Sequence, residues 1–187
     1  MKLDHLIKTP KNWEPIPAEV MSWLKKHVKN LELKPTQNFS FENGELNLDK
    51  ESRLVLTGIS DNDIPSWKFG KVGEIEFDHS CSFTKFDFLP YRVDYNLYFD
   101  FKMSLKGIHK RVKSCNIFYL SKDTTSGILD ILKIADIRGG IVVSGGASNL
   151  DPDFKKAFLM VKFGFEDEED ILDVQDKLFN AGLERFA

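Results

Sequence analysis

Residues 93–99 read Val-Asp-Tyr-Asn-Leu-Tyr-Phe, and this stretch decides the fold because versions of it recur along the chain. Residues 72–77 read Val-Gly-Glu-Ile-Glu-Phe, and residues 112–119 read Val-Lys-Ser-Cys-Asn-Ile-Phe-Tyr. Each version has a valine, preceded by a lysine or arginine, and then a short apolar/polar alternation that ends on an aromatic ring. Alternation with a period of two is typical of a β-strand with one buried face.

The strand ends are evenly spaced. Leu56, Phe77, Phe99 and Tyr119 are separated by steps of 21, 22 and 20 residues, and an apolar triplet follows at 141–143. A period of roughly 20–29 residues with one short strand per unit is the signature of leucine-rich-repeat-like coils, whose stacked units bury one continuous core. The spacing therefore predicts a short solenoid. A sandwich or an irregular sheet is the alternative.

Helical patterns flank the repeats. Apolar or bulky residues at Val20, Trp23, Leu24 and His27 follow the spacing of an amphipathic helix. Between that helix and the repeats, Asn43-Gly44 separates two short alternating pieces and predicts a tight hairpin.

Two further helices are expected near the C-terminus. Asp151-Pro152 is an N-cap and first-turn pair, and the acidic run 166–170 suits the start of a second helix. Gly182 is a typical residue after a helix end. These helices are expected to cover the open end of the solenoid, as capping units do.

The fold class predicted is therefore α+β: a short leucine-rich-repeat-like β-solenoid flanked by an N-terminal helix and a C-terminal two-helix cap. Residues 1–187 are expected to form one domain, because a chain of this length fits a single core. Its parts are an N-terminal helical region at 1–30, a β-rich repeat region at 31–146 and a helical cap at 147–187.

Composition narrows the class of function. The net charge of −3 gives no basic field of the kind that nucleic-acid binders show, so nucleic acid is an unlikely partner. No stretch approaches the roughly 20 apolar residues that span a bilayer, so no membrane partner is expected. The two cysteines and the absence of a secretory pattern at the start favour free thiols in a cytoplasm.

No catalytic, cofactor-binding or metal-binding group is predicted. The four histidines are scattered singly, and the run 78–81, Asp-His-Ser-Cys, lies on a strand end where neighbouring side chains face opposite sides. A zinc site from Cys81, Cys115, His79 and His109 is the alternative, although the spacing matches no zinc module. The chain is accordingly expected not to be an enzyme.

The alternating polar positions of the repeats define the candidate site. In such a coil the residues between the buried positions point outward and form columns across the units. Aligned by the aromatic strand ends, one column contains Glu76, Tyr98 and Phe118. The predicted partner-binding residues are Glu74, Glu76, Asp78, Asn96, Tyr98, Asp100, Asn116 and Phe118. The alternative is that Phe118 is covered by the flanking helices.

Residues 64–187 resemble a group of small leucine-rich-repeat-like proteins of T-even-type bacteriophages. The resemblance rests on two repeat units, 88–93 and 105–112, and on three pieces of the tail, which read GILDILKI at 127–134, DILDVQDKL at 170–178 and AGLERFA at 181–187. It transfers no activity. It implies expression in an infected bacterial cell and a host or phage protein as partner.

Together these observations predict a non-enzymatic protein-binding module that inhibits or redirects a host protein, such as a toxin, a defence factor or a nucleic-acid-processing protein. Two other hypotheses stay open. One is a nucleic-acid-binding accessory protein that uses the basic loop 106–113, and the other is an enzyme whose site assembles from scattered residues.

Overall fold

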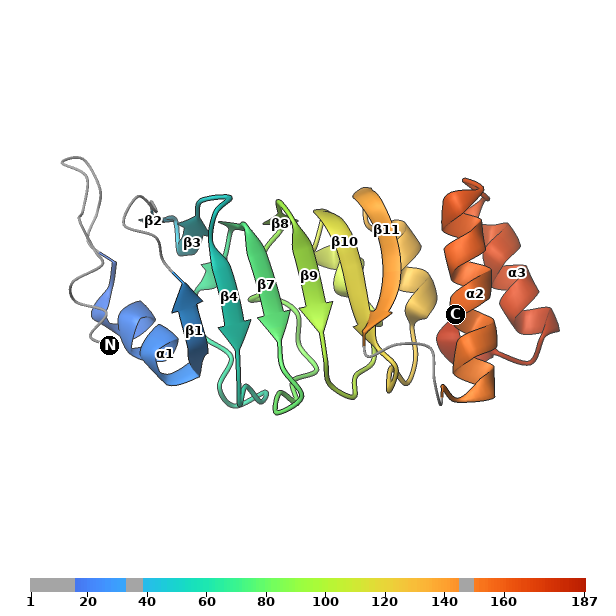
Figure 1. Ribbon diagram of the computed structural model, residues 1–187, viewed down its shortest axis with the longest axis horizontal. Coiled ribbons are helices and arrows are strands. Elements are labelled where there is room, and N and C mark those ends of the chain that lie inside the picture. Colours follow the sequence, from blue (N-terminus) through green and yellow to red (C-terminus); the bar gives the residue numbers. More distant parts are fainter. Residues whose placement is uncertain (1–15, 33–38, 145–149) are drawn as a thin grey trace.

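The structure is a computed structural model that describes residues 16–32, 39–144 and 150–187. Figure 1 shows an elongated molecule in which α1 lies at one end and α2 and α3 lie at the other. Between them the main strands stand side by side, in sequence order from β4 to β11, along the long axis. The predicted order of helix, β-rich region and helix pair is therefore confirmed for the described residues.

The elements have the following bounds. The helices are α1 (Ala18–His27), α2 (Pro152–Glu166) and α3 (Ile171–Asn180), and the described short 3-10 helices are η2 (Ile108–Lys110), η3 (Ile128–Lys133) and η4 (Glu184–Phe186). The strands are β1 (Val28–Glu32), β2 (Phe39–Glu42), β3 (Glu45–Leu48), β4 (Arg53–Leu56), β5 (Lys68–Phe69), β6 (Lys71–Val72), β7 (Glu74–Phe77), β8 (Arg92–Val93), β9 (Asn96–Phe99), β10 (Ser114–Ser121) and β11 (Asp136–Ser144).

The main sheet has the topology of a coil. Strand β4 pairs with β7, β7 with β9, β9 with β10 and β10 with β11, and all four pairings are parallel. Each turn of the chain thus adds one strand beside the previous one, whereas a β-sandwich is built from antiparallel pairs. Strand β1 closes the first edge by pairing antiparallel with β4. The sheet is therefore solenoid-like, as the repeat period predicts.

A ladder of phenylalanines forms the centre of the core. Phe77 and Phe99 come from neighbouring turns, and their rings stack with centroids 5.3 Å apart and an interplanar angle of 7°. Phe118 continues the ladder 5.7 Å from Phe99. Phe83 and Phe88 come from the connection after β7 and pack edge-on against Phe77. Most of the phenylalanines thus fill the hydrophobic core. Burying each such side chain stabilises the fold by about 1.5–3 kcal/mol.

The basic residue and valine that precede each strand form a second line of contacts. Val72 and Val93 lie side by side in the β6–β8 pair and are fully buried, as is Val112 of the next turn. The basic residues are held by partners within the fold: the Lys71 ammonium lies 3.2 Å from a carboxylate oxygen of Asp94. The basic residue followed by valine was identified in the sequence, but the two-residue strands β6 and β8 that this motif forms were not predicted.

Arg111 is the most heavily bonded of these basic residues. Its guanidinium donates to the carbonyl oxygens of Leu89 at 2.7 Å and Phe69 at 2.7 Å, and to the carboxylate of Glu45 at 2.9 Å. Arg111 therefore ties three segments of the chain together, because its acceptors lie in β3, in β5 and in the connection between β7 and β8.

The local signals at turns and helix ends are confirmed. Asn43 and Gly44 both have positive φ, 53° and 75°, and join β2 to β3 as an Asn-Gly hairpin turn should. The Asp151 carboxylate accepts the N–H of Phe154 at 2.9 Å and caps α2. Asp170 caps α3 in the same way, and Gly182 takes the left-handed conformation after its end.

The predicted register is confirmed for β4, β7 and β9 and is wrong by one residue for β10. Leu56 lies opposite Phe77, and Phe77 lies opposite Phe99, but Tyr119 lies opposite Tyr98 and not opposite Phe99. The cause is a break in the alternation of β10, which has one residue fewer than β11 between the pairs Cys115–Ile137 and Ile117–Gly140. Asn116 and the residue after it are both partly exposed, so the inside–outside alternation slips by one position there.

Candidate functional site

The outward face of the sheet carries one continuous row of side chains, here called the outer row. The strand pairings place Val55, Glu76, Tyr98, Tyr119 and Val142 opposite one another on β4, β7, β9, β10 and β11. All five are at least partly exposed. From Glu76 on β7 to Val142 on β11, the row changes from charged to aromatic to aliphatic.

The centre of the outer row is a stacked tyrosine pair. The rings of Tyr98 and Tyr119 lie 4.1 Å apart at 17°. The Tyr98 hydroxyl oxygen accepts a hydrogen bond of 3.2 Å from the Asn96 amide, whose nitrogen also donates to the Glu74 carboxylate at 2.8 Å. Burial, and next the negative charge of Glu74, raise the pKa of Tyr98 to about 12. Tyr98 therefore stays neutral and fixed in orientation across the physiological pH range.

The carboxylates of Glu74 and Glu76, beside the tyrosines, form ion pairs with Arg53 of β4. The Arg53 guanidinium lies 2.9 Å from a Glu74 oxygen and 3.6 Å from a Glu76 oxygen. Glu74 is thus bonded on both sides, by Arg53 and by Asn96, and serves to position the row. Glu76 retains more exposure, with 28% of its side chain accessible.

Two of the predicted site residues are not on this face. Phe118 is fully buried, because the break in the alternation of β10 turns it inward beside Phe99, and Tyr119 takes the outward place predicted for it. Asp78 is only 6% exposed and accepts hydrogen bonds from the Ser80 N–H and hydroxyl. Burial raises the pKa of Asp78, but these bonds outweigh it and the pKa is lowered. Asp78 therefore holds a turn.

The remaining predicted residues lie at the sides of the outer row. Asp100 is exposed just beyond the end of β9, and the Ser144 hydroxyl lies 3.4 Å from its carboxylate. Asn116 is partly exposed at the break in the alternation of β10, and its side-chain oxygen lies over Gly139 of β11, where a Cβ atom would come within 2.9 Å of it. Gly139 thus makes room for the Asn116 side chain.

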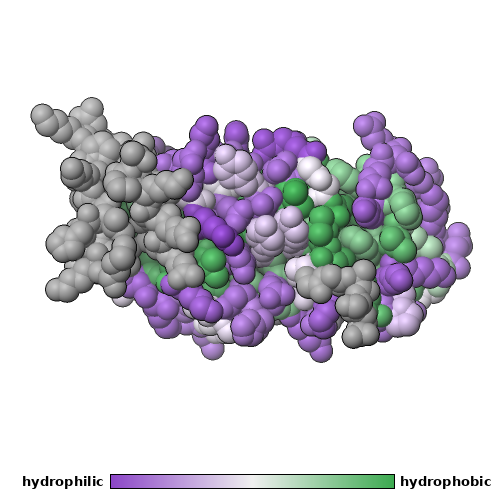
Figure 2. All heavy atoms as spheres, viewed as in Figure 1, coloured by the Kyte–Doolittle hydropathy of each residue, from purple (hydrophilic) through white to green (hydrophobic). Residues whose placement is uncertain are grey.

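A groove that the sequence did not predict continues the outer row beyond β11. It has a volume of about 230 Å³, and its wall is apolar except for two lysines. We call it the β11–α2 groove, and its lining residues are Ile141, Val142, Val143, Leu150, Lys155, Phe158, Leu159 and Lys162. Figure 2 shows the corresponding concentration of hydrophobic residues over β11 and α2, on the face seen in Figure 1. Val142 belongs to both the row and the groove, so the two form one surface.

The sequence shows each wall of this groove separately but contains no pattern that predicts the groove as a whole. Its β11 wall comes from an apolar triplet and its α2 wall from positions between the core residues of the helix, such as Leu159. No single periodicity joins the two elements. Leu159 and Phe163 are 37% and 53% exposed, which shows that α2 presents apolar side chains on more than its core face.

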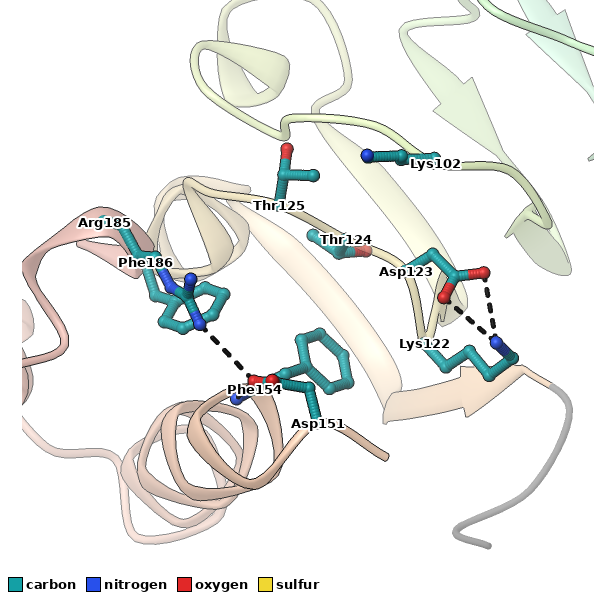
Figure 3. Close-up of a pocket in the computed structure, with 9 residues that line it drawn as sticks. All are labelled: Lys102, Lys122, Asp123, Thr124, Thr125, Asp151, Phe154, Arg185 and Phe186. Carbon is teal, nitrogen blue, oxygen red and sulfur yellow. Dashed lines mark hydrogen bonds and ion pairs between the residues drawn. The ribbon is translucent and has the colours of Figure 1, made fainter. Parts of the chain in front are cut away.

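A second, polar pocket of about 420 Å³ lies between the turns after β9 and β10 and the cap. Figure 3 shows Lys102, Thr124 and Thr125 on one side and Phe154 and Phe186 on the other. Its charged groups largely satisfy one another: Lys122 lies 3.0 Å from Asp123, and Arg185 lies 3.4 Å from Asp151. The lining provides hydrogen-bonding groups of both charges and no nucleophile paired with a base.

The thiols are buried apart from each other in the fold. Cys81 is 5% exposed and Cys115 is fully buried, and both are free. Burial raises the pKa of Cys81 to about 11 and that of Cys115 to about 12. Within residues 16–32, 39–144 and 150–187, no three His, Cys, Asp or Glu side chains are arranged to hold a metal ion, so the alternative zinc site is not formed.

The basic loop 106–113 is committed to the fold only in part. Arg111 is bonded as described above, and the Lys113 ammonium donates to the His109 carbonyl at 2.7 Å. The other two lysines of the loop, at 106 and 110, are exposed. This arrangement provides fewer available cations for a phosphate backbone than the sequence suggests.

No known protein family, curated protein or solved structure gives a significant match to this chain. The resemblance to the small phage proteins therefore stays a prediction. Among the described helices, none combines the length and the hydrophobicity that a membrane crossing requires.

Proposed function

We propose that this chain is a protein-binding module without a catalytic role, and that its contact surface is the outer row together with the β11–α2 groove. The observation that carries the proposal is the stacked Tyr98–Tyr119 pair, which stands on a parallel sheet and leads through Val142 into an apolar groove. Tyrosines on a rigid support are enriched at interfaces, where they contribute large contact areas at low entropic cost.

The surface is also pre-organised for a partner. Arg53, Glu74, Asn96 and Tyr98 form one connected set of ion pairs and hydrogen bonds, so the side chains are already ordered before contact. Ordering an interface side chain on binding costs about 0.5–1.5 kcal/mol, and pre-ordered side chains avoid part of that cost. The surface combines apolar contact with directional polar groups, as protein interfaces do.

The resemblance to leucine-rich-repeat-like phage proteins directs the choice of partner. We infer a host or phage protein in the cytoplasm of an infected bacterium, which the chain would inhibit or redirect. Repeat-built coils commonly bind through the ladder of their strands, and the outer row is such a ladder.

The test is affinity capture from bacterial lysate with the full chain immobilised. The wild type is compared with a Tyr98→Ala/Tyr119→Ala double variant and with a Tyr91→Ala/Tyr95→Ala control. The control removes two tyrosines that are also exposed, at 38% and 45%, but lie outside the outer row. Circular dichroism melting checks that all three chains are folded.

We expect a saturable partner that wild type and control retain and that the double variant loses. Removing two interface aromatics costs roughly 2 kcal/mol or more each where they are hot spots, so the loss should exceed a hundredfold in Kd. Absence of a saturable partner, or equal retention by the double variant, would overturn the proposal.

A further inference from the structure

The β11–α2 groove has the size of an anchor site. At about 230 Å³ it is smaller than the roughly 300–1,000 Å³ of small-molecule sites, and it is bounded by Ile141, Val143 and Phe158 with few polar groups. Pockets of this kind at interfaces receive a single large apolar side chain of the partner, which is then fully desolvated.

The charge beside the groove is positive. Lys155 and Lys162 both line it, and they lie seven residues apart on α2, which is two turns of one helix face. Lys155 forms no ion pair with any side chain among the described residues. Lys162 lies 3.5 Å from the exposed carboxylate of Glu166, a weak pairing that a better acceptor can replace.

From this combination we infer that the β11–α2 groove binds an acidic segment of a partner protein, with one large apolar side chain in the groove and carboxylates beside it paired with Lys155 and Lys162. The inference rests on the proposed function and specifies the chemistry of the partner. The outer row would contact the partner next to the same segment, because Val142 is shared by the row and the groove.

The experiment uses a display library of random peptides panned on the full chain. The probe for measurement is the best enriched peptide, labelled and titrated by fluorescence polarisation. We expect enriched sequences to combine a large apolar residue with aspartate or glutamate. Replacing those acids with amides should weaken binding about tenfold or more at low salt, and added salt should reduce the difference.

Matched variants locate the site. Lys155→Glu/Lys162→Glu should weaken the peptide about tenfold or more, and Val142→Asp should abolish binding by placing a charge against the apolar wall. Lys156→Glu is the control, because Lys156 is exposed on the same helix and does not line the groove. The Lys156→Glu variant should bind the peptide within about twofold of the wild-type affinity. Any larger difference from long-range electrostatics should disappear when salt is added.

Peptides without acidic residues, no enrichment at all, or equal affinity for the charge-reversed variant would each overturn the inference. The proposed function is judged separately, by loss of a lysate partner on removal of Tyr98 and Tyr119. A partner that depends on the tyrosines but not on Lys155 and Lys162 would therefore refute the anchor and leave the binding face standing.

Discussion

At the scale of single residues, adjacent aromatic side chains on β10 have opposite roles. Phe118 is fully buried in the phenylalanine ladder, whereas Tyr119 faces outward against Tyr98. We expect Phe118→Ala to lower the free energy of unfolding by about 3–5 kcal/mol, because it leaves a cavity in the core. Tyr119→Ala should cost about 1 kcal/mol or less. Urea unfolding followed by fluorescence measures both, and the reverse order of the two losses would show that the register is wrong.

The two cysteines give a residue-scale prediction about pH. Burial raises the thiol pKa values to about 11 and 12, above the ordinary value of 9.0. The folded chain therefore holds these protons more tightly than the unfolded chain. Their contribution to stability is complete below pH 9 and is lost as the pH rises through 11 to 12.

Thiol labelling measures this protection directly. At pH 8 an aromatic disulfide reagent should react with neither Cys81 nor Cys115 in the native chain and with both after denaturation, because the native thiols are buried and protonated. Each single Cys→Ala variant assigns the signal to one site. Rapid labelling of the native chain at either site would contradict the burial described here.

At the scale of elements, the close approach of α2 and α3 depends on Gly164. A Cβ atom at that position would lie 2.4 Å from a methyl carbon of Val174. Alanine in a helix interior is favoured over glycine by about 1 kcal/mol, but the overlap should cost about 1–3 kcal/mol. We expect Gly164→Ala to be net destabilising in thermal unfolding, with a lowered Tm.

A double-variant cycle isolates that contact. Val174→Ala alone should destabilise the chain, because Val174 is fully buried. Combined with Gly164→Ala, the methyl group added at 164 replaces volume removed at 174, so the double variant should be more stable than the sum of the two losses. Additive losses would mean that the helices do not meet at these residues.

The same elements show what the sequence could and could not predict. Local signals sufficed where one residue decides the geometry, as at Asn43-Gly44, Asp151 and Gly182. The register of β10 was missed because the alignment matched Asn116 with Asn96. Shifting the alignment by one residue places Ile117 opposite Asn96, Phe118 inside and Tyr119 outside. The difference in polarity between the apolar Phe118 ring and the hydroxyl-bearing Tyr119 ring could have indicated this register.

The β11–α2 groove could not be predicted for a different reason. It forms between a strand and a helix whose separation depends on how the cap packs against the last turn, mainly through contacts of α2 and α3 with η3. Sequence periodicity identifies the buried face of each element. It does not give the distance left between two elements, and that distance creates the groove.

At the scale of the whole molecule, the two ends of the coil are closed differently. At the β4 edge, β1 pairs antiparallel and α1 packs Val20 and Leu24 into the core. At the other end, β11 pairs only with β10 among the described strands, and α2 and α3 cover η3. The cap therefore protects the last turn of the core from water.

Removing the cap tests this dependence. A chain that stops after Ser144 should expose Ile128, Leu129 and Ile131, which are at most 1% accessible in the complete fold. Because nearest-neighbour contacts stabilise a coil, the loss should be greatest at that end, and the exposed apolar end and strand edge should associate between molecules. We expect oligomers or precipitate in size-exclusion chromatography and a lowered Tm. Arg185→Ala, which removes exposed ion pairs of the cap and a contact of the guanidinium with the Phe186 ring, is the control and should elute like the wild type. A truncated chain that stayed monomeric with an unchanged Tm would show that the coil is stable without its cap. In that case the stability of the coil would not require α2, and the β11–α2 groove would not arise from the need to close the core.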